Sequence, residues 1–287
     1  MCGIAGVIHR GKTSDIGSEM TSMLTALKHR GPDSTGFAVY GKPADNNNEF
    51  VMRFKVAEQE DLNKGSNILS TIAERRAAVN GRMAEHNAKI LTEVDATEYA
   101  YRYAFSFDGD DAALEKMTRY IEELEGAEIL SLGRGLELVK DLGDANVVSD
   151  QYGLKGFQGT HALGHTRMAT ESDVDIRSAH PYWAYPYNDI SVVHNGQITN
   201  YWIMRRQMEF KGHRFLSNCD SELLAVYTAD KLNDGYTLED SLRQSIEEID
   251  GVFTYVVATK DCLGMAKDTM AAKPMVLFES DDLVVLA

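Results

Sequence analysis

Short apolar runs alternate with stretches of helical spacing at the start of the chain. The run Gly3–Ile8 is rich in Ile and Val and predicts a buried strand. Across Ser14–Lys28 the apolar residues recur three or four positions apart, which predicts a helix. The basic cluster and Gly31 that follow are typical of a helix end, because cations favour the C-terminal dipole and Gly stops the helix. Gly36–Tyr40 and Phe50–Val56 predict the next two strands.

The pattern changes between about residues 58 and 151, where Ala, charged and aromatic residues dominate. Asp110 stands where it can cap a helix, because its carboxylate can accept hydrogen bonds from the first free N–H groups. We interpret this segment as a central α/β insertion in a single domain that spans residues 1–287. In chain order, its expected elements are a helix at 66–91, a strand at 98–107, a helix at 110–124, a strand at 129–132 and a helix at 135–142.

The strand pattern returns after the insertion. Thr237 followed by Asp240 resembles a capping box, with Asp in place of the usual Glu, and it predicts a helix start. The expected strands are 161–165, 190–194, 252–259, 275–279 and 283–286, and the expected helices are 220–232 and 237–249.

Composition narrows the class of protein. Asp and Glu outnumber Lys and Arg by 44 to 29, a formal net charge of −15, which disfavours a nucleic-acid groove and docking on an anionic membrane. The three cysteines form no CxxC pair, so no zinc ribbon or other metal site is expected, and they are too few to hold a cubane iron–sulfur cluster. No apolar run has the length of a signal peptide or a membrane span, so we expect a cytoplasmic protein.

Cys2 is the first residue whose chemistry suggests a reaction. A small residue at this position usually leads to removal of the initiator Met, which would leave a thiol and a free α-amine on the same residue. The thiolate is the nucleophilic form, and an α-amine with a pKa near ~8 can take the thiol proton at neutral pH. The plain alternative is a small residue that stands at position 2 by coincidence.

Five motifs, in a fixed order from the N-terminus, raise the weight of Cys2. They are MCGI at the start, HRGPDS at 29–34, GHTRMAT at 164–170, HNGQITN at 194–200 and CDSELL at 219–224, followed by DGVF at 250–253 and KPM at 273–275. Together they resemble the class II glutamine amidotransferases, which are N-terminal nucleophile hydrolases. The resemblance implies an α+β fold, a four-layer αββα sandwich with two mostly antiparallel sheets face to face. It also implies release of ammonia from glutamine by Cys2.

The resemblance assigns further roles by position. Asn195 and Gly196 would form the oxyanion hole for the tetrahedral intermediate. Arg167 would bind the α-carboxylate through two parallel hydrogen bonds, and Asp220 would hold the α-ammonium. Thr170 and His180 line the glutamine pocket in relatives, and Arg30 would lie behind the site and support the Cys2 loop.

Each of these residues also has a simpler interpretation. Asn-Gly is a common hairpin turn, Asp220 stands where a helix N-cap is expected, and a His before a Pro is typical of a loop. Two positions depart from the family pattern. Met168 stands where some relatives carry an aromatic residue, and Glu171 where some carry His.

The ammonia acceptor is expected on another chain, because the sequence ends without a synthase module. The motifs and the insertion most resemble stand-alone amidotransferase subunits of glutamate-synthase-like and N-methylglutamate synthase systems, in which a partner subunit would carry FMN and an iron–sulfur cluster. The expected ligands are therefore glutamine or glutamate, within a hetero-oligomer. The alternative is a non-hydrolytic subunit for assembly or channelling, because a retained Met1 would deprive Cys2 of its α-amine. An N-terminal nucleophile amidase for another amide is a weaker third possibility.

Overall fold

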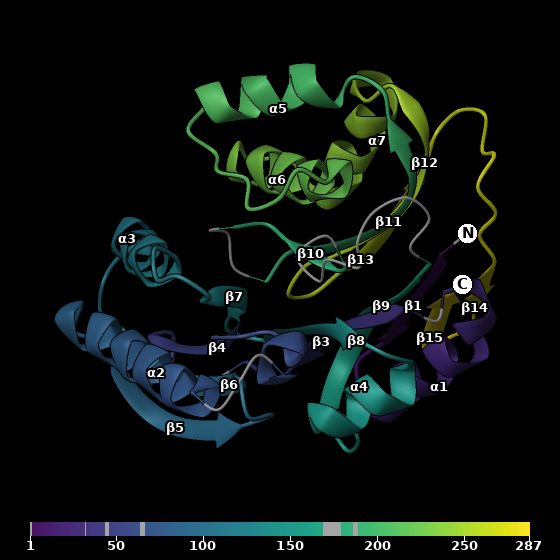
Figure 1. Cartoon of the computed structure of the whole chain (residues 1–287). Helices are drawn as coiled ribbons and strands as arrows, with labels where there is room; N and C mark the ends of the chain where they lie inside the picture. The colour runs from purple at the N-terminus through teal and green to yellow at the C-terminus, as the bar shows by residue number, and fades with distance from the viewer. Residues whose placement is uncertain (1, 32, 44–45, 64–66, 169–178, 186–188) are drawn as a thin grey trace. The chain divides into compact units, whose positions relative to one another are not determined.

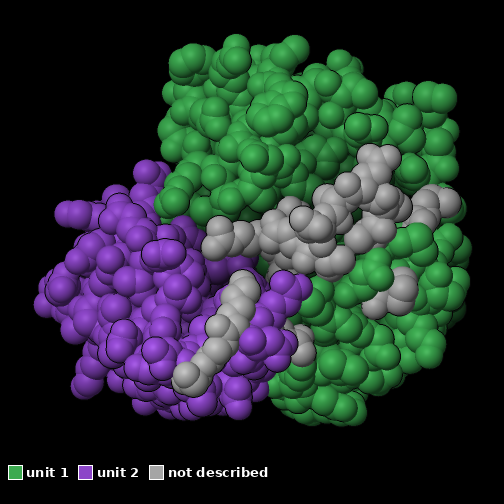
Figure 2. All heavy atoms as spheres, viewed as in Figure 1, with its two compact units in different colours: residues 1–42, 140–287 green, residues 43–139 purple. Residues whose placement is uncertain are grey.

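The computed structural model describes residues 2–31, 33–43, 46–63, 67–168, 179–185 and 189–287. The chain forms two compact units, residues 1–42 with 140–287 and residues 43–139, which Figure 2 shows in green and purple. No helix in the described ranges is long and apolar enough to cross a bilayer.

The first unit is built on a seven-stranded sheet. Its central strand β9 (Gln158–Arg167) lies between β1 (Gly3–His9) and β3 (Ser34–Gly41) and pairs antiparallel with both. In this register His165 lies opposite Ile4 and Gly36. The order is β14 (Leu277–Glu279), β15 (Leu283–Leu286), β1, β9, β3 and β8 (Leu136–Leu142), with β2 (Ser14–Asp15) paired to β9.

A second, four-stranded sheet packs against the first. Its strands are β10 (Tyr182–Trp183), β11 (Ser191–Ile198), β12 (Gly251–Ala258) and β13 (Leu263–Lys267), paired antiparallel in that order. The buried hydroxyl of Tyr40 on β3 joins the two sheets, because it hydrogen-bonds Ser191 Oγ at 2.7 Å and donates to the Ala258 carbonyl at 2.9 Å. A Cβ added to Gly6 of β1 would lie 3.3 Å from Leu263 and 3.5 Å from Val256, so the two sheets are also in close apolar contact there.

Helices cover the outer faces of both sheets. α1 (Ile16–Ala26) and α4 (Ala145–Gln151) lie on the first sheet, and the 3₁₀ turn η1 (Lys28–Arg30) follows α1. The second sheet is covered by α5 (Tyr201–Phe210), α6 (Asp220–Asn233) and α7 (Leu238–Glu248) (Figure 1). The layers therefore run helix, sheet, sheet, helix, which confirms the predicted four-layer fold class.

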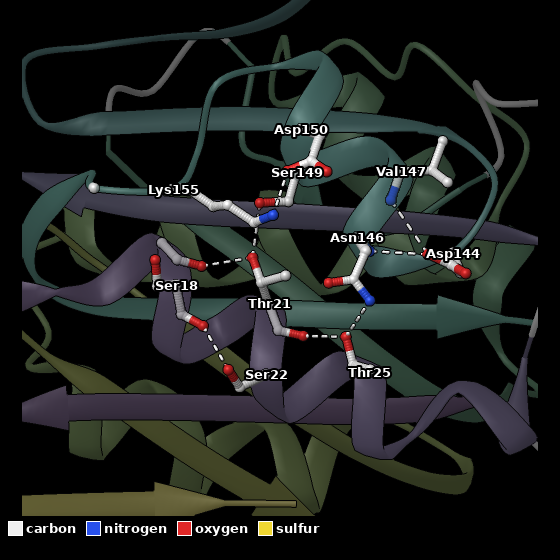
Figure 3. A network of polar contacts seen from close by, with 12 residues as sticks. Ser18, Thr21, Ser22, Thr25, Asp144, Asn146, Val147, Ser149, Asp150 and Lys155 are labelled. Carbon is white, nitrogen blue, oxygen red and sulfur yellow. Dashed lines mark hydrogen bonds and ion pairs between the residues drawn. The ribbon is translucent and has the colours of Figure 1, made fainter.

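Side-chain hydrogen bonds fix α4 on α1 (Figure 3). Thr21 Oγ1 donates to Ser149 Oγ at 2.8 Å, and the Asn146 amide donates to Thr25 Oγ1 at 3.1 Å. Asp144 caps the N-terminus of α4 by accepting from two of its backbone N–H groups. The sequence analysis missed this helix, which is only seven residues long.

The second unit contains its own sheet. The strands are β5 (Lys89–Asp95), β6 (Ala100–Ser106), β4 (Glu49–Lys55) and β7 (Glu128–Gly133), in that order, accompanied by α2 (Ile68–Glu85), α3 (Asp111–Glu122) and the 3₁₀ helix η2 (Gln59–Asn63). Glu137 is buried among the cations Arg53 and Arg102 and accepts from both at 2.7–2.9 Å. Burial alone would raise the pKa of Glu137, but the two guanidinium groups hold it below its ordinary value.

The structure confirms two predicted helix caps and corrects two predicted helices. The caps Asp110 and Thr237 are confirmed, because each side chain accepts from the backbone N–H three residues on. The predicted helix at 135–142 is wrong, because these residues form the buried strand β8. The predicted helix at 66–91 ends at Glu85, and the edge strand β5 follows it. The expected insertion at about 58–151 overlaps the second unit, residues 43–139, without sharing its bounds.

Candidate active site

A cavity of about 600 Å³ lies in the first unit and gathers the chemically distinctive residues of the sequence. Of the predicted site residues that the structure describes, Cys2, Arg167, His180, Asn195, Gly196 and Asp220 all line it. Its remaining lining residues are His165, Met168, His194, Asn218, Cys219, Ser221 and Lys273. Cys2 and Lys273, which are 271 positions apart in sequence, therefore meet at one site. Thr170 lies outside the described residues.

Cys2 lies directly before β1, an interior strand of the first sheet that pairs with β15 and β9. Its thiol is free, and its residue is partly buried. The side-chain amide of Asn195 donates to the backbone carbonyl of Cys2 at 2.9 Å. Gly3 keeps β1 close to β9, because a Cβ there would meet Thr166 Oγ1 at 2.6 Å. These contacts fix the backbone directly after the residue that carries the sulfur.

Gly196 occupies a conformation that favours glycine. Its φ is +148°, and a Cβ would overlap the backbone carbonyl of Val252. Asn195 and Gly196 pair with Thr254 and Phe253 within the continuous ladder of β11 and β12. The hairpin-turn interpretation of this Asn-Gly pair is therefore wrong, because the strand continues through it to Ile198.

Arg167 is the last residue of β9, and the HRGPDS segment packs against its backbone. The Asp33 N–H donates to the Arg167 carbonyl at 3.1 Å, and a Cβ on Gly31 would overlap the Arg167 backbone. This segment was expected to support the Cys2 loop, and its observed contacts are with Arg167. Arg30 lies in η1 and is not among the described residues that line the cavity.

Asp220 is the first residue of α6, but it does not cap the helix. The N-cap residue is Cys219, and no side chain caps that end. Instead, Asp220 Oδ2 accepts the N–H of Ile198 at 2.8 Å, and Oδ1 accepts the hydroxyl of Ser221 at 3.2 Å. The interpretation of Asp220 as a helix cap is therefore wrong, and its carboxylate lies against β11, on the strand that carries Asn195.

Three buried histidines form one wall of the cavity. The rings of His165 and His180 stack with centroids 4.1 Å apart, and His194 meets His180 edge-on at 6.5 Å. Burial lowers the pKa of His165 to about 3 and that of His194 to about 4, and it holds the pKa of His180 well below its ordinary value. All three rings are therefore neutral at neutral pH.

The other charged side chains that line the cavity are complementary to the two charges of a zwitterion. Arg167 and Lys273 supply positive charge, and Asp220 supplies negative charge. Lys273 is positioned by its backbone carbonyl, which accepts from Thr254 Oγ1 at 3.1 Å. The sequence analysis noted the KPM motif without giving Lys273 a role, and it left His165 and His194 unassigned although both stand in motifs. Across the described ranges, no group of three or more His, Cys, Asp or Glu side chains is arranged to hold a metal ion.

Comparisons with known proteins identify the family of the chain. The glutamine amidotransferase domain family matches residues 165–287, which include all the lining residues except Cys2. A putative glutamine amidotransferase of Methanothermobacter thermautotrophicus is 38% identical over 288 residues, which cover 100% of this chain and 91% of that protein. The chain belongs to the glutamine amidotransferase family.

Other relatives of this amidotransferase differ in length and in similarity. A glutamine amidotransferase-like protein of Rhizobium meliloti is 30% identical over 99% of this chain and 88% of its own. Among solved structures, the glutamine phosphoribosylpyrophosphate amidotransferase of B. subtilis superposes with a TM-score of 0.55 at 14% identity, over 100% of this chain and 41% of that chain. An allosteric regulatory enzyme of purine biosynthesis gives a TM-score of 0.58 at 16% identity and the same coverage. At these identities the two structures show the shared N-terminal nucleophile hydrolase fold alone.

Proposed function

We propose that this amidotransferase hydrolyses glutamine to glutamate and ammonia through the thiolate of Cys2. The observation that carries the proposal is the convergence of Cys2, the pair Asn195 and Gly196, and the opposite charges of Arg167 and Asp220 on one cavity. Glutamine presents the complementary groups, because it has a reactive amide at one end and a carboxylate and an ammonium at the other.

The reaction follows from the chemistry of these groups. With Met1 removed, the α-amine of Cys2 takes the thiol proton, and the sulfur attacks the side-chain amide carbon. The oxygen of the resulting tetrahedral intermediate accepts hydrogen bonds from the Gly196 N–H and from the Asn195 amide, which has a second N–H besides the one bonded to Cys2. The C–N bond then breaks, the leaving nitrogen takes the proton, and ammonia departs. Water attacks the thioester, which releases glutamate and restores the thiol.

The far end of the substrate is bound by charge. The guanidinium of Arg167 can donate two parallel hydrogen bonds to a carboxylate, and the carboxylate of Asp220 can accept hydrogen bonds from the α-ammonium. The neutral histidine wall adds no charge to compete with either contact. Lys273 adds a second positive charge to the lining of the cavity.

We further propose that the ammonia is passed to a synthase subunit of the glutamate-synthase or N-methylglutamate-synthase kind. The support is the resemblance of the motifs to those systems and the family membership of the chain. In such a complex the partner would hold the FMN and the iron–sulfur cluster, and this chain would supply nitrogen. The reaction would take place in the cytoplasm.

The test combines the mass of the N-terminus with one substitution. Intact-mass measurement of the purified protein is expected to show that Met1 is absent, and Cys2→Ala is expected to abolish release of ammonia from glutamine. Cys262→Ala is the matched control, because Cys262 is also a free cysteine but is exposed and does not line the cavity. Ammonia release that survives in Cys2→Ala would overturn this proposal. A retained Met1, together with no release of ammonia from glutamine by the wild-type protein, would favour the non-hydrolytic alternative.

A further inference from the structure

A chain of hydrogen bonds leads from Asp220 into the second sheet. The hydroxyl of Ser221 donates to Asp220 Oδ1 at 3.2 Å, and Ser221 Oγ also lies 2.8 Å from Nδ1 of His194. Ser221 and His194 are both almost fully buried, at 2% and 3% exposure. Because Ser221 and His194 are shielded from water, their hydrogen bonds have few alternative partners.

The donor and the acceptor in each of these two hydrogen bonds follow from the chemistry of the groups. A carboxylate can only accept, so the Ser221 hydroxyl gives its proton to Asp220. Nδ1 of His194 must then carry the proton that the Ser221 oxygen accepts. Burial keeps the pKa of His194 at about 4, so the ring is neutral and holds a single proton. The chain therefore runs in one direction, from His194 through Ser221 to Asp220, and Nε2 of His194 is unprotonated.

The same imidazole also touches the oxyanion-hole residue. A Cβ added to Gly196 would lie 2.9 Å from Nε2 of His194, so the ring packs directly beside the Gly196 backbone. Asp220 has a second link to this strand, because its Oδ2 accepts the N–H of Ile198 at 2.8 Å. Asp220 is thus tied to β11 on both sides of the Asn195-Gly196 pair.

We propose that His194 and Ser221 are positioning residues that fix the Asp220 carboxylate for the α-ammonium of the substrate and couple it to the oxyanion strand. The inference rests on the proposed function. Binding of the substrate ammonium at Asp220 would fix the position of β11 through the two hydrogen-bonded links, one at His194 and one at Ile198. The Gly196 N–H would then face the substrate amide when the ligand carries an α-amino group. A ligand without the amino group would not bind at Asp220 and would therefore not fix β11 in this way.

The first experiment compares two substrates in three variants of the full chain. The substrates are glutamine and its analogue in which hydrogen replaces the α-amino group. Ser221→Ala removes the bridging hydroxyl, and Ser221→Thr retains it. Ser245→Ala is the matched control, because Ser245 is a buried serine in α7 whose hydroxyl is bonded to Tyr255, away from the residues that line the cavity.

Ser221→Ala is expected to lower kcat/KM for glutamine about tenfold, the usual effect of losing a hydrogen bond to a charged group, and to change the value for the des-amino analogue by less than about twofold. The loss should appear in kcat as well as in KM, and Ser221→Thr should restore most of it. Equal losses with both substrates would overturn the role of Ser221 at Asp220. A loss confined to KM would overturn the coupling to the oxyanion strand.

A second experiment does not need turnover, so it separates this inference from the proposed function. L-glutamate and glutarate differ by the same amino group, and calorimetry measures their binding to the wild-type protein and to Ser221→Ala. The substitution should weaken L-glutamate binding about tenfold and leave glutarate binding nearly unchanged. If wild-type protein fails to hydrolyse glutamine, the proposed function is wrong, and these two affinities still decide the role of Ser221. Unaltered L-glutamate binding in Ser221→Ala would overturn it.

Discussion

The side-chain amide of Asn195 donates a hydrogen bond to the backbone carbonyl of Cys2 at 2.9 Å, which links the second sheet to the start of the first. The proposed nucleophile, Cys2, and the expected oxyanion donor are therefore held together before any substrate binds. Hydrogen-bond donors that are fixed in advance stabilise a transition state more strongly, because they need not reorganise when charge develops on the substrate.

Asn195→Ala should lower kcat for glutamine hydrolysis by about 10²–10³, with a smaller change in KM, because one donor to the developing oxyanion is lost. Steady-state kinetics of ammonia release measure the effect. Asn146→Ala is the control, since Asn146 joins α4 to α1 and does not line the cavity. A variant that keeps wild-type kcat would remove Asn195 from the oxyanion hole.

Arg167→Lys should raise KM for glutamine by about 10- to 100-fold, because a point charge replaces a planar pair of donors on the substrate carboxylate. The value of kcat should change much less, since the carboxylate lies far from the reacting carbon. The control is Arg243→Lys, at an exposed arginine that pairs with Glu239 on α7. A fall in kcat with KM unchanged would contradict the assignment.

His180 should make the protein less stable in mild acid. Burial, with His165 and His194 nearby, holds the pKa of His180 well below 6.5, so the folded ring stays neutral where the unfolded ring takes a proton. The unfolded state then binds more protons below its pKa. The free energy of unfolding should therefore fall as pH drops below about 6.5, by about 1.4 kcal/mol per pH unit for this histidine.

His180→Phe removes that contribution and breaks no hydrogen bond made by the ring, because neither ring nitrogen has a partner in the described structure. Urea unfolding at several pH values between about 7.5 and 5 measures the free energy of unfolding. This free energy should fall less steeply with decreasing pH in the variant than in the wild type, by about 1.4 kcal/mol per pH unit. Tyr182→Phe, at the ring that meets His180 edge-on, should leave the slope as in the wild type. Parallel slopes for His180→Phe and wild type would refute the prediction.

Two glycines should respond to alanine in opposite directions. A Cβ at Gly36 would overlap the backbone carbonyl of His180, so Gly36→Ala should destabilise the protein by about 1–3 kcal/mol. Gly81 lies inside α2 with nothing within 4 Å of an added Cβ, so Gly81→Ala should stabilise it by about 0.5–1 kcal/mol. Thermal unfolding of both variants gives the comparison, and equal shifts would contradict it.

The sequence predicted elements best where burial and periodicity agree. Gly3–His9 is almost wholly apolar and forms the buried strand β1, as expected. β8 was predicted as a helix, but these residues form a strand in which the charged residues Glu137 and Lys140 are buried. α5 was missed because Trp202 and Phe210 are exposed on it, which obscures the apolar stripe.

The candidate site could be predicted where a residue type carries its own chemistry. Cys2 falls into this class, whereas Arg167 and Asp220 were predicted from the resemblance of their motifs, and the structure brings all three to one cavity. His194 and Ser221 act, in our proposal, through hydrogen bonds between β11 and α6, and no sequence spacing encodes those contacts. Burial decides whether such a histidine is neutral, and burial depends on residues that are far away in sequence.

β8 has a consequence for how this chain can vary. The Asp33 carbonyl accepts the Gly143 N–H, and the Thr35 hydroxyl donates to the Gly143 carbonyl, so the end of β8 is fixed to the start of β3. The polypeptide that leaves the first unit after Lys42 rejoins it at Lys140, within this strand. None of the described residues that line the cavity comes from the segment between them, so that segment can diverge in sequence while the cavity is inherited intact.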